Sequence, residues 1–134
     1  MGDTLLFDVI KQSSYALFQL STRDKKTAPI GGVQSTNPTM PVFSPDGKWI
    51  AYSARTPGQV RNSLYVEPFP PTGAKYQISD DDGHHPRWTS TGKELFFIRR
   101  AGQFVVVPVA AVPASRPARP SSCGAGSRRR HPAL

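Results

Sequence analysis

Cysteine and long apolar runs are nearly absent from this sequence of 134 residues. Its one cysteine, Cys123, excludes an internal disulfide and says little about the redox compartment. No window approaches the roughly 18 apolar residues that a membrane-spanning helix needs. The N-terminus lacks the basic region, apolar run and small-residue cleavage site of a secretory signal. The sequence therefore predicts neither a membrane span nor a signal peptide.

Motifs for the common catalytic chemistries are also missing. There is no Gly-x-Ser-x-Gly elbow, which a serine hydrolase of the peptidase type needs, and no serine has the context of a nucleophile. The pair Gly31-Gly32 is not followed by the Gly-Lys-Ser/Thr of a phosphate-binding loop. We therefore expect no enzyme activity, no catalytic residue, no metal site and no cofactor, and the sequence identifies no ligand-binding residue.

Acidic residues are few, and the basic excess is unevenly distributed. The net charge is +8, but residues 1–110 hold 12 of the 17 Lys and Arg and all nine acids, which leaves +3 there. The remaining +5 lies in residues 111–134, which contain no acid. The total charge would suggest an anionic partner. Because most of the excess lies in the C-terminal segment, such a partner would be attracted by that segment and not by residues 1–110.

The C-terminal segment, residues 110–134, consists almost entirely of Ala, Pro, Ser, Arg and Gly. It cannot bury enough apolar surface to offset the entropy of ordering, so we expect a disordered basic tail. Arg116, Arg119 and Arg128–Arg130 would attract polyanions without sequence preference and in a salt-sensitive way. The tail has no aromatic residue for base stacking. We therefore expect no specific nucleic-acid binding.

What the sequence does contain is a series of short strand-like runs between turn formers, with no sustained helical spacing. The chain has 14 prolines and 11 glycines, and the runs between them are rich in aromatic and β-branched residues. We read the chain as all-β. The predicted strands are Thr4–Val9, Tyr15–Leu20, Met40–Phe43, Trp49–Ser53, Leu64–Glu67, Lys75–Ile78, Arg87–Thr89, Glu94–Ile98 and Phe104–Val109.

One stretch of the sequence is repeated. Residues 41–53 (PVFSPDGKWIAYS) recur at an offset of 45 as residues 86–98 (PRWTSTGKELFFI). A second pair, residues 64–69 and 104–109, matches at an offset of 40, so the connection Ala54–Ser63 should be five residues longer than its counterpart. The turn formers Ser44-Pro-Asp-Gly47 and Thr89-Ser-Thr-Gly92 occupy equivalent places. Self-similarity at this period indicates a repeat architecture.

The strands after these turns put apolar groups on both faces, as in Trp49–Tyr52 and Leu95–Ile98. This pattern favours sheets sandwiched between neighbouring sheets over a two-sheet sandwich, which would alternate more cleanly. We therefore predict a partial β-propeller of about two and a half four-stranded blades. The repeat units are residues 1–36, 37–80 and 81–109.

The segments Ser44–Ser53 (SPDGKWIAYS) and Leu64–Pro70 (LYVEPFP) resemble the TolB-like, WD-repeat-like propellers of bacteria. Residues 75–79, 85–88 and 92–97 are similar to a narrower group, the propellers at the C-terminus of bacterial serine/threonine protein kinases and related regulators. The resemblance covers roughly residues 3–109. It implies a protein- or ligand-binding, sensory module and slightly favours a periplasmic or extracytoplasmic location over the cytoplasm. The residues alone leave the compartment unknown.

Propellers of this family have about six or seven blades, so the chain holds less than half a ring. Two and a half blades leave two apolar faces uncovered. We expect the chain to be a fragment of a longer protein; the alternatives are that copies associate through these faces or that the piece is only marginally stable. An accessory propeller of a prolyl-oligopeptidase-type hydrolase, whose catalytic domain is absent here, is the alternative function. In both readings the partner is a protein or small ligand bound at the rim of the ring.

Three groups of residues are candidates for a site, and each also has a structural interpretation. Asp80–His85 (DDDGHH) has the ligand types of a cation site, but its spacing is not that of a calcium loop, and we interpret it as an exposed connection between blades. Trp49 and Trp88 could stack on a ligand, but we assign both to the core. Arg55, Arg61 and Arg99-Arg100 lie at loop edges, where they form either a basic rim or solvated surface charges.

Overall fold

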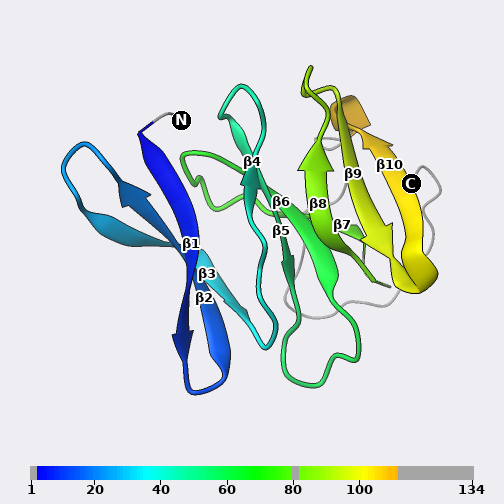
Figure 1. Cartoon of the computed structure of the whole chain (residues 1–134), viewed down its shortest axis with the longest axis horizontal. Coiled ribbons are helices and arrows are strands. Elements are labelled where there is room, and N and C mark those ends of the chain that lie inside the picture. The colour runs from blue at the N-terminus through cyan, green and yellow to red at the C-terminus, as the bar shows by residue number, and fades with distance from the viewer. Residues whose placement is uncertain (1–2, 80–81, 112–134) are drawn as a thin grey trace.

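The computed structural model describes residues 3–79 and 82–111, which form three antiparallel sheets side by side (Figure 1). The first sheet has the order β1 (Thr4–Lys11), β2 (Ser14–Ser21), β3 (Thr27–Ser35). The central sheet has the order β4 (Val42–Phe43), β5 (Trp49–Ala54), β6 (Ser63–Pro68), β7 (Tyr76–Ser79). The third sheet consists of β8 (His84–Trp88), β9 (Glu94–Arg99) and β10 (Gln103–Pro108).

The prediction of an all-β chain is confirmed, and each predicted strand has a counterpart. The sequence did not identify β3, because Pro29, Gly31 and Gly32 within it are typical of turns. The strand tolerates these residues because it is an edge strand, paired only with β2, and the pairing shifts register between Ala16 and Phe18. Proline and glycine within sheets concentrate at such edges and irregularities.

The two copies of the repeated stretch have the same local structure. Gly47 N–H donates to the carbonyl of Ser44 at 2.9 Å, and Gly92 N–H donates to the carbonyl of Thr89 at 2.8 Å. Both glycines have a φ of 74°, a left-handed conformation that glycine adopts without steric cost. The hydroxyls of Ser44 and Thr89 accept the N–H of the residue five positions later in each copy. The 45-residue correspondence is therefore structural.

The second correspondence is also present in the structure. Phe69 N–H donates to Lys48 O, and Val109 N–H donates to Lys93 O, each at 2.8 Å. Eight residues separate β5 from β6, whereas three, forming the short 3-10 turn Arg100–Gly102, separate β9 from β10. The five extra residues therefore lie in the β5–β6 loop, as predicted.

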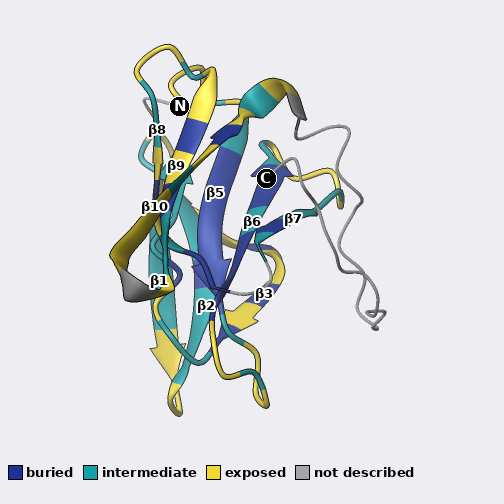
Figure 2. Ribbon diagram, turned by 90° about the vertical axis from the view of Figure 1, so that its right-hand side faces the viewer, coloured by how far each residue is buried: buried dark blue, intermediate teal, exposed yellow. Residues whose placement is uncertain are grey.

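The core consists of two clusters, one on each face of the central sheet. Ala51, Leu64 and Val66 pack against Leu95 and Phe97 of the third sheet. On the opposite face the second cluster joins the first and central sheets, and its buried members are Leu17, Ile30, Val33, Ile50, Tyr52 and Ala54. Figure 2 shows β5 buried along its length. The apolar residues on both faces of β5 are thus explained by burial between two neighbouring sheets.

One buried carboxylate lies within the interface of the first and central sheets. Glu67 is 5% exposed, and its Oε2 accepts a hydrogen bond from the hydroxyl of Tyr52 at 2.6 Å. The Tyr52 ring stacks on Tyr65, over which the ammonium of Lys75 lies 4.3 Å from the ring centre. Burial, and then the nearby charge of Glu67, raise the pKa of Tyr52 far above its ordinary value.

This environment predicts a pH dependence of stability that Tyr52→Phe removes. Because the folded state favours the neutral phenol, the stabilisation is complete below the unfolded pKa of about 10 and is lost as pH rises above it, by about 1.4 kcal/mol per pH unit. The free energy of unfolding, measured with urea between pH 8 and 11.5, should therefore decline more steeply for the natural chain than for Y52F. Lys75, whose pKa burial lowers, is common to both chains and cancels in the comparison. Parallel declines would contradict the buried phenol.

At its end, the described chain passes from β10 into a second 3-10 turn, Val109–Ala111. Apart from its first two residues, the predicted tail of residues 110–134 lies outside the described residues. The proposed unit boundaries remain a prediction. Within residues 3–79 and 82–111, no helix is long and apolar enough to cross a membrane.

Candidate functional site

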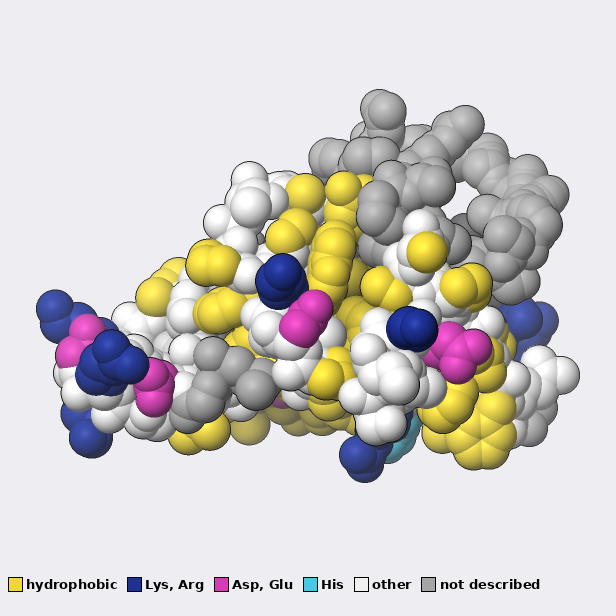
Figure 3. All heavy atoms as spheres, turned by 90° about the horizontal axis from the view of Figure 1, so that it is seen from above, with side chains coloured by type: hydrophobic (Ala, Val, Ile, Leu, Met, Phe, Trp, Pro, Cys, Tyr) yellow, Lys and Arg dark blue, Asp and Glu magenta, His cyan; other side chains and the backbone are white. Residues whose placement is uncertain are grey.

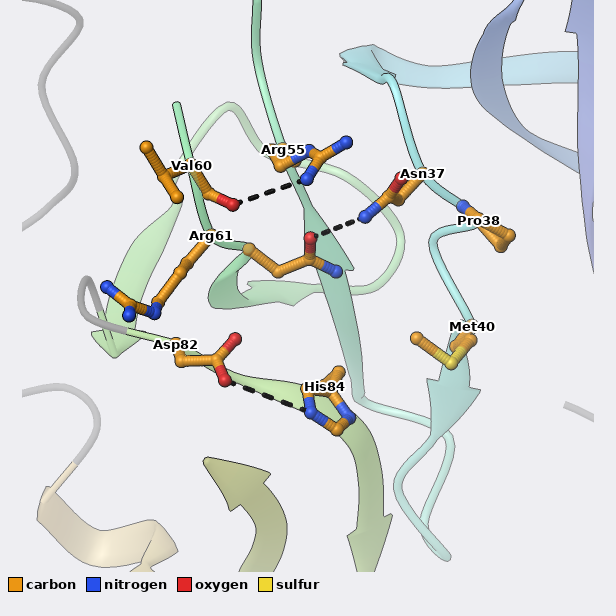
Figure 4. A pocket seen from close by; sticks show the side chains of 9 residues that line it. Asn37, Pro38, Met40, Arg55, Val60, Arg61, Asp82 and His84 are labelled. Carbon is orange, nitrogen blue, oxygen red and sulfur yellow. Dashed lines mark hydrogen bonds and ion pairs between the residues drawn. The ribbon is translucent and has the colours of Figure 1, made fainter. Parts of the chain in front are cut away.

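A pocket of about 310 Å³ opens at the end of the central sheet where the β5–β6 loop lies (Figure 4). Three stretches that are distant in the sequence meet there: the linker from β3 to β4, the β5–β6 loop, and the segment that leads into β8. The residues that line the pocket are Asn37, Pro38, Met40, Arg55, Val60, Arg61, Asn62, Asp82 and His84.

The β3–β4 linker is held in place by both sheets that it joins. Thr39 is fully buried, and its N–H and hydroxyl both donate to the carboxylate of Asp8 on β1, at 3.0 and 2.6 Å. The carbonyl of Thr39 accepts the N–H of Ser53 on β5 at 2.8 Å. Asp8 therefore connects the first sheet to the linker, and the linker presents Asn37 and Met40 to the pocket from a fixed backbone.

A chain of hydrogen bonds connects the three stretches. Asn37 Nδ2 donates to Asn62 Oδ1 at 2.9 Å, Asn62 Nδ2 donates to Ser53 Oγ at 2.6 Å, and Ser53 Oγ donates to Gly83 O at 2.7 Å. Asn62 is 7% exposed and Ser53 is fully buried. Buried polar groups that are all satisfied specify a single arrangement, so the floor of the pocket is preorganised.

Two arginines from the β5–β6 region supply positive charge. Arg55 Nε donates to Thr36 Oγ1 at 3.1 Å, and its Nη1 donates to the carbonyl of Val60 at 3.2 Å. Arg61 is exposed at the mouth of the pocket. Within the part of the chain that the structure describes, neither arginine forms an ion pair with a carboxylate. Both arginines therefore bring positive charge to the pocket.

Asp82 and His84 form another part of the pocket wall, across from Arg55 (Figure 4). Our interpretation of Asp80–His85 as an exposed connection is wrong for Asp82, which is 8% exposed. The segment is drawn inward because Ser53 donates to Gly83 and Ser79 donates to the carbonyl of Asp82. The carboxylate of Asp82 lies 3.9 Å from His84 Nε2. Asp80 and Asp81 lie outside the described residues.

Metal chemistry has no geometric support in the described residues. No group of three or more His, Cys, Asp or Glu side chains there is arranged to hold a metal ion. His84 Nδ1 lies 2.7 Å from His85 Nδ1, and the backbone of His85 has a φ of 55°. The two adjacent imidazoles therefore contact each other through Nδ1, while Nε2 of His84 faces Asp82.

Both tryptophans belong to the packing between the central and third sheets. Trp49 and Trp88 are half-buried against the cluster around Leu64, and Trp88 Nε1 donates to the carbonyl of Val42 at 3.3 Å. Trp88 also lines a second pocket of about 290 Å³ between β4 and β8. The core assignment of these residues is confirmed, although each ring keeps some exposure.

The sequence identified Arg55 and Arg61 as candidates for a basic rim, and the structure brings both to the pocket. Arg99 and Arg100 lie at the equivalent β9–β10 connection of the third sheet and do not line it. Sequence reasoning missed Asn37 and Asn62. Each stands alone in a turn-rich stretch, and nothing local indicates that residues 25 positions apart form a hydrogen bond.

No protein-family model matches the chain, and no curated protein matches its sequence. Among solved structures it is similar to TolB from Acinetobacter baumannii, with a TM-score of 0.67 and 14% identity over 87% of the chain and 29% of TolB. It is also similar to the β-propeller domain of the Trilobed protease from Pyrococcus furiosus, which has an open velcro topology, with a TM-score of 0.61 and 12% identity over 87% of the chain and 37% of that domain's chain.

A third similar structure is hydrazine synthase of Kuenenia stuttgartiensis, with a TM-score of 0.60 and 18% identity over 86% of the chain and 40% of the synthase chain. The chain thus spans between 29% and 40% of the length of these structures. At these identities the likeness establishes the fold alone. The fold is that of a partial, TolB-like β-propeller.

Proposed function

We propose that this chain is a non-enzymatic binding module, part of the propeller of a larger bacterial regulator such as a protein kinase. The observation that carries this proposal is the pocket at the β5–β6 end, where three stretches of the chain converge on a preorganised polar floor. Binding residues concentrate on loops that a rigid scaffold positions. The link to a kinase rests on the sequence resemblance of residues 75–97.

The chemistry of the pocket favours a carboxylate-bearing peptide segment as ligand. Arg55 and Arg61 carry positive charge without an ion-pair partner in the described chain, and planar guanidinium groups match carboxylates in a bidentate way. Asp82 and His84 lie across the pocket from Arg55 (Figure 4), where a backbone N–H of the same peptide would find an acceptor. A polyanion of uniform charge would instead be repelled by Asp82.

The expected result is that Arg61→Gln weakens binding of a fluorescein-labelled, glutamate-containing peptide by about tenfold, a loss of about 1.4 kcal/mol. Fluorescence anisotropy at 0.15 M salt measures it. Arg61 is suited to the test because it is exposed and its side chain makes no hydrogen bond that the fold requires within the described residues.

Lys93→Gln is the matched control. It removes one positive charge from the turn between β8 and β9, which lies at the end of the third sheet away from the pocket. Its effect should remain within about twofold, because an exposed charge more than a Debye length of about 8 Å away is screened. Equal losses for both variants would mean that the peptide follows net charge and not the pocket. Absence of peptide binding by the natural chain would remove the carboxylate ligand from the proposal.

The similarity to a protease propeller domain favours one alternative. In that alternative the module is the accessory propeller of a hydrolase and restricts access to a catalytic domain. A Gly-x-Ser-x-Gly segment in the same reading frame or its neighbour would support the hydrolase, whereas a kinase domain upstream would support the regulator.

A further inference from the structure

The pocket at the β5–β6 end is built by the part of the chain that departs from the internal repeat. Eight residues connect β5 to β6, whereas the equivalent connection of the third sheet is the three-residue turn Arg100–Gly102. The longer loop supplies Arg55, Val60, Arg61 and Asn62 to the pocket. Insertions in repeat proteins concentrate in loops on one face, which is often the binding face. The extra length of this loop therefore points to the pocket as the place where the chain recognises a ligand.

The pocket opens at the end of the central sheet and not on a face that another sheet would cover. Its residues come from the β5–β6 loop, from the linker that enters the central sheet and from the segment that leaves it (Figure 4). Neighbouring blades of a propeller pack face to face. Further blades of a longer protein would therefore stack beside the first and third sheets and leave this end of the central sheet open.

One part of the pocket wall is apolar. Val60 is 79% exposed, the largest exposed fraction among the large apolar side chains of the described residues. Pro38 and Met40 line the pocket from the β3–β4 linker, and the Met40 side chain points into it (Figure 4). The backbone of Met40 has a φ of 50°, a conformation that non-glycine residues adopt mainly where the surrounding structure holds them, often at functional sites.

The polar part of the wall has groups with unused hydrogen-bonding capacity. Arg55 uses Nε and Nη1 for bonds within the chain, but its Nη2 makes none with the described residues. Asp82, across the pocket, is 8% exposed, and its carboxylate accepts no hydrogen bond within the described residues. His84 Nε2, at 3.9 Å, is too far away for one. Because buried polar groups are normally hydrogen-bonded, a ligand N–H would satisfy this carboxylate.

A cation, a hydrogen-bond acceptor and an apolar surface thus meet in about 310 Å³. Ligand pockets range from about 300 to 1,000 Å³, so this one is small and the complementary groups of its ligand must lie close together. The last residue of a peptide meets that requirement, because its α-carboxylate, its side chain and its backbone N–H are all attached to one carbon atom. The carboxylate of an internal glutamate stands at the end of a flexible side chain, away from its own backbone and from any apolar group.

We propose that the pocket binds the free C-terminus of a peptide whose last residue is apolar, which rests on the proposed function and narrows its ligand. The α-carboxylate lies against the guanidinium groups of Arg55 and Arg61. The last backbone N–H donates to Asp82, and the last side chain packs against Met40 and Val60. Capture of a terminal carboxylate is one of the recurring modes of peptide recognition.

The second pocket, at the opposite end of the molecule, lacks one of these groups. It lies between β4 and β8 and contains Arg87 and Trp88, but none of its described lining residues is acidic. Figure 3 views this end and shows several Lys and Arg side chains beside Asp or Glu side chains, as in the ion pair of Arg23 with Asp3. The combination of cation, N–H acceptor and apolar surface therefore favours the β5–β6 end.

Fluorescence anisotropy at 0.15 M salt with three peptides, each labelled with fluorescein at its N-terminus, tests the proposal. The first peptide ends in Ser-Leu with a free carboxylate, and the second is the same peptide with a C-terminal carboxamide. The third is the carboxamide peptide with a glutamate in its middle. The first should bind about tenfold more tightly than either of the others, because only it offers an α-carboxylate for charge-assisted hydrogen bonds.

Val60→Ser tests the apolar contact. It should weaken binding of the first peptide by about fourfold, which corresponds to the loss of one buried methylene. Phe104→Ser is the matched control, because Phe104 is almost as exposed as Val60, at 76% against 79%, but lies on β10 and does not line the pocket. F104S should keep the affinity of the natural chain. Equal losses for V60S and F104S would overturn the packing of the last side chain on Val60.

The three peptides separate failure of this proposal from failure of the proposed function. If the glutamate peptide binds as tightly as the peptide with the free terminus, the C-terminal ligand is wrong, but the proposed function stands because it requires only a carboxylate. Equal binding of the first two peptides likewise overturns the C-terminal ligand. Absence of binding by all three overturns both proposals.

Discussion

Replacing Phe97 with alanine is expected to lower the free energy of unfolding by about 3–5 kcal/mol, the cost of removing a buried aromatic ring from a packed core. Phe97 is 2% exposed in the cluster that joins the central and third sheets. Loss of its ring leaves a cavity between two sheets that are fixed by their own hydrogen bonds, so the site cannot collapse easily. Urea unfolding followed by circular dichroism measures the loss.

Phe96→Ala is the control, because it removes the same side chain from the adjacent position on the opposite face of β9. Phe96 is 38% exposed, so Phe96→Ala should lower the free energy of unfolding by only about 1 kcal/mol. Equal losses would mean that the inward and outward faces of β9 are wrongly assigned.

Gly83→Ala is expected to destabilise the fold by about 3 kcal/mol, at the upper end of the range for overpacked sites. A Cβ on Gly83 would lie 2.9 Å from the Cβ of Leu64 and 3.3 Å from that of Ser79, and both belong to strands of the central sheet. Neither atom can move by a rotamer change, so the backbone at Gly83 must shift. The hydrogen bond from Ser53 to its carbonyl would weaken at the same time.

Gly32→Ala is the matched substitution at a glycine that has open space around it, with no atom within 4 Å of the added Cβ. It should be neutral within about 0.5 kcal/mol or slightly stabilising, because alanine restricts the unfolded chain more than glycine does. Thermal melting of the two variants against the natural chain provides the comparison. A neutral Gly83→Ala would show that the segment leading into β8 does not pack against β6 as described.

Local features of the fold could be predicted because each is encoded in a few adjacent residues. The turns at Ser44–Gly47 and Thr89–Gly92 follow from the conformational preferences of proline, aspartate and glycine. The burial of both faces of β5 was evident from Trp49–Tyr52, since apolar groups at successive positions of a strand must point in opposite directions. The spacing of the repeats then fixed which residues are equivalent.

The candidate site could be predicted only in part. Arg55 and Arg61 were identifiable as loop-edge charges, but Asn37, Asn62 and the burial of Asp82 were not. These features depend on hydrogen bonds between residues 25 and 30 positions apart, such as that from Ser53 to Gly83. No local pattern encodes such pairs.

By itself, the sequence determined that the chain forms small, repeated antiparallel sheets with apolar residues on both faces, since strand period, turn chemistry and repeat spacing are all properties of neighbouring residues. Only the tertiary structure decided that Thr27–Ser35 is an edge strand and that three stretches converge on one pocket. It also decided which apolar side chains stay exposed. The physical reason is that packing between sheets places residues side by side without regard to their distance along the chain.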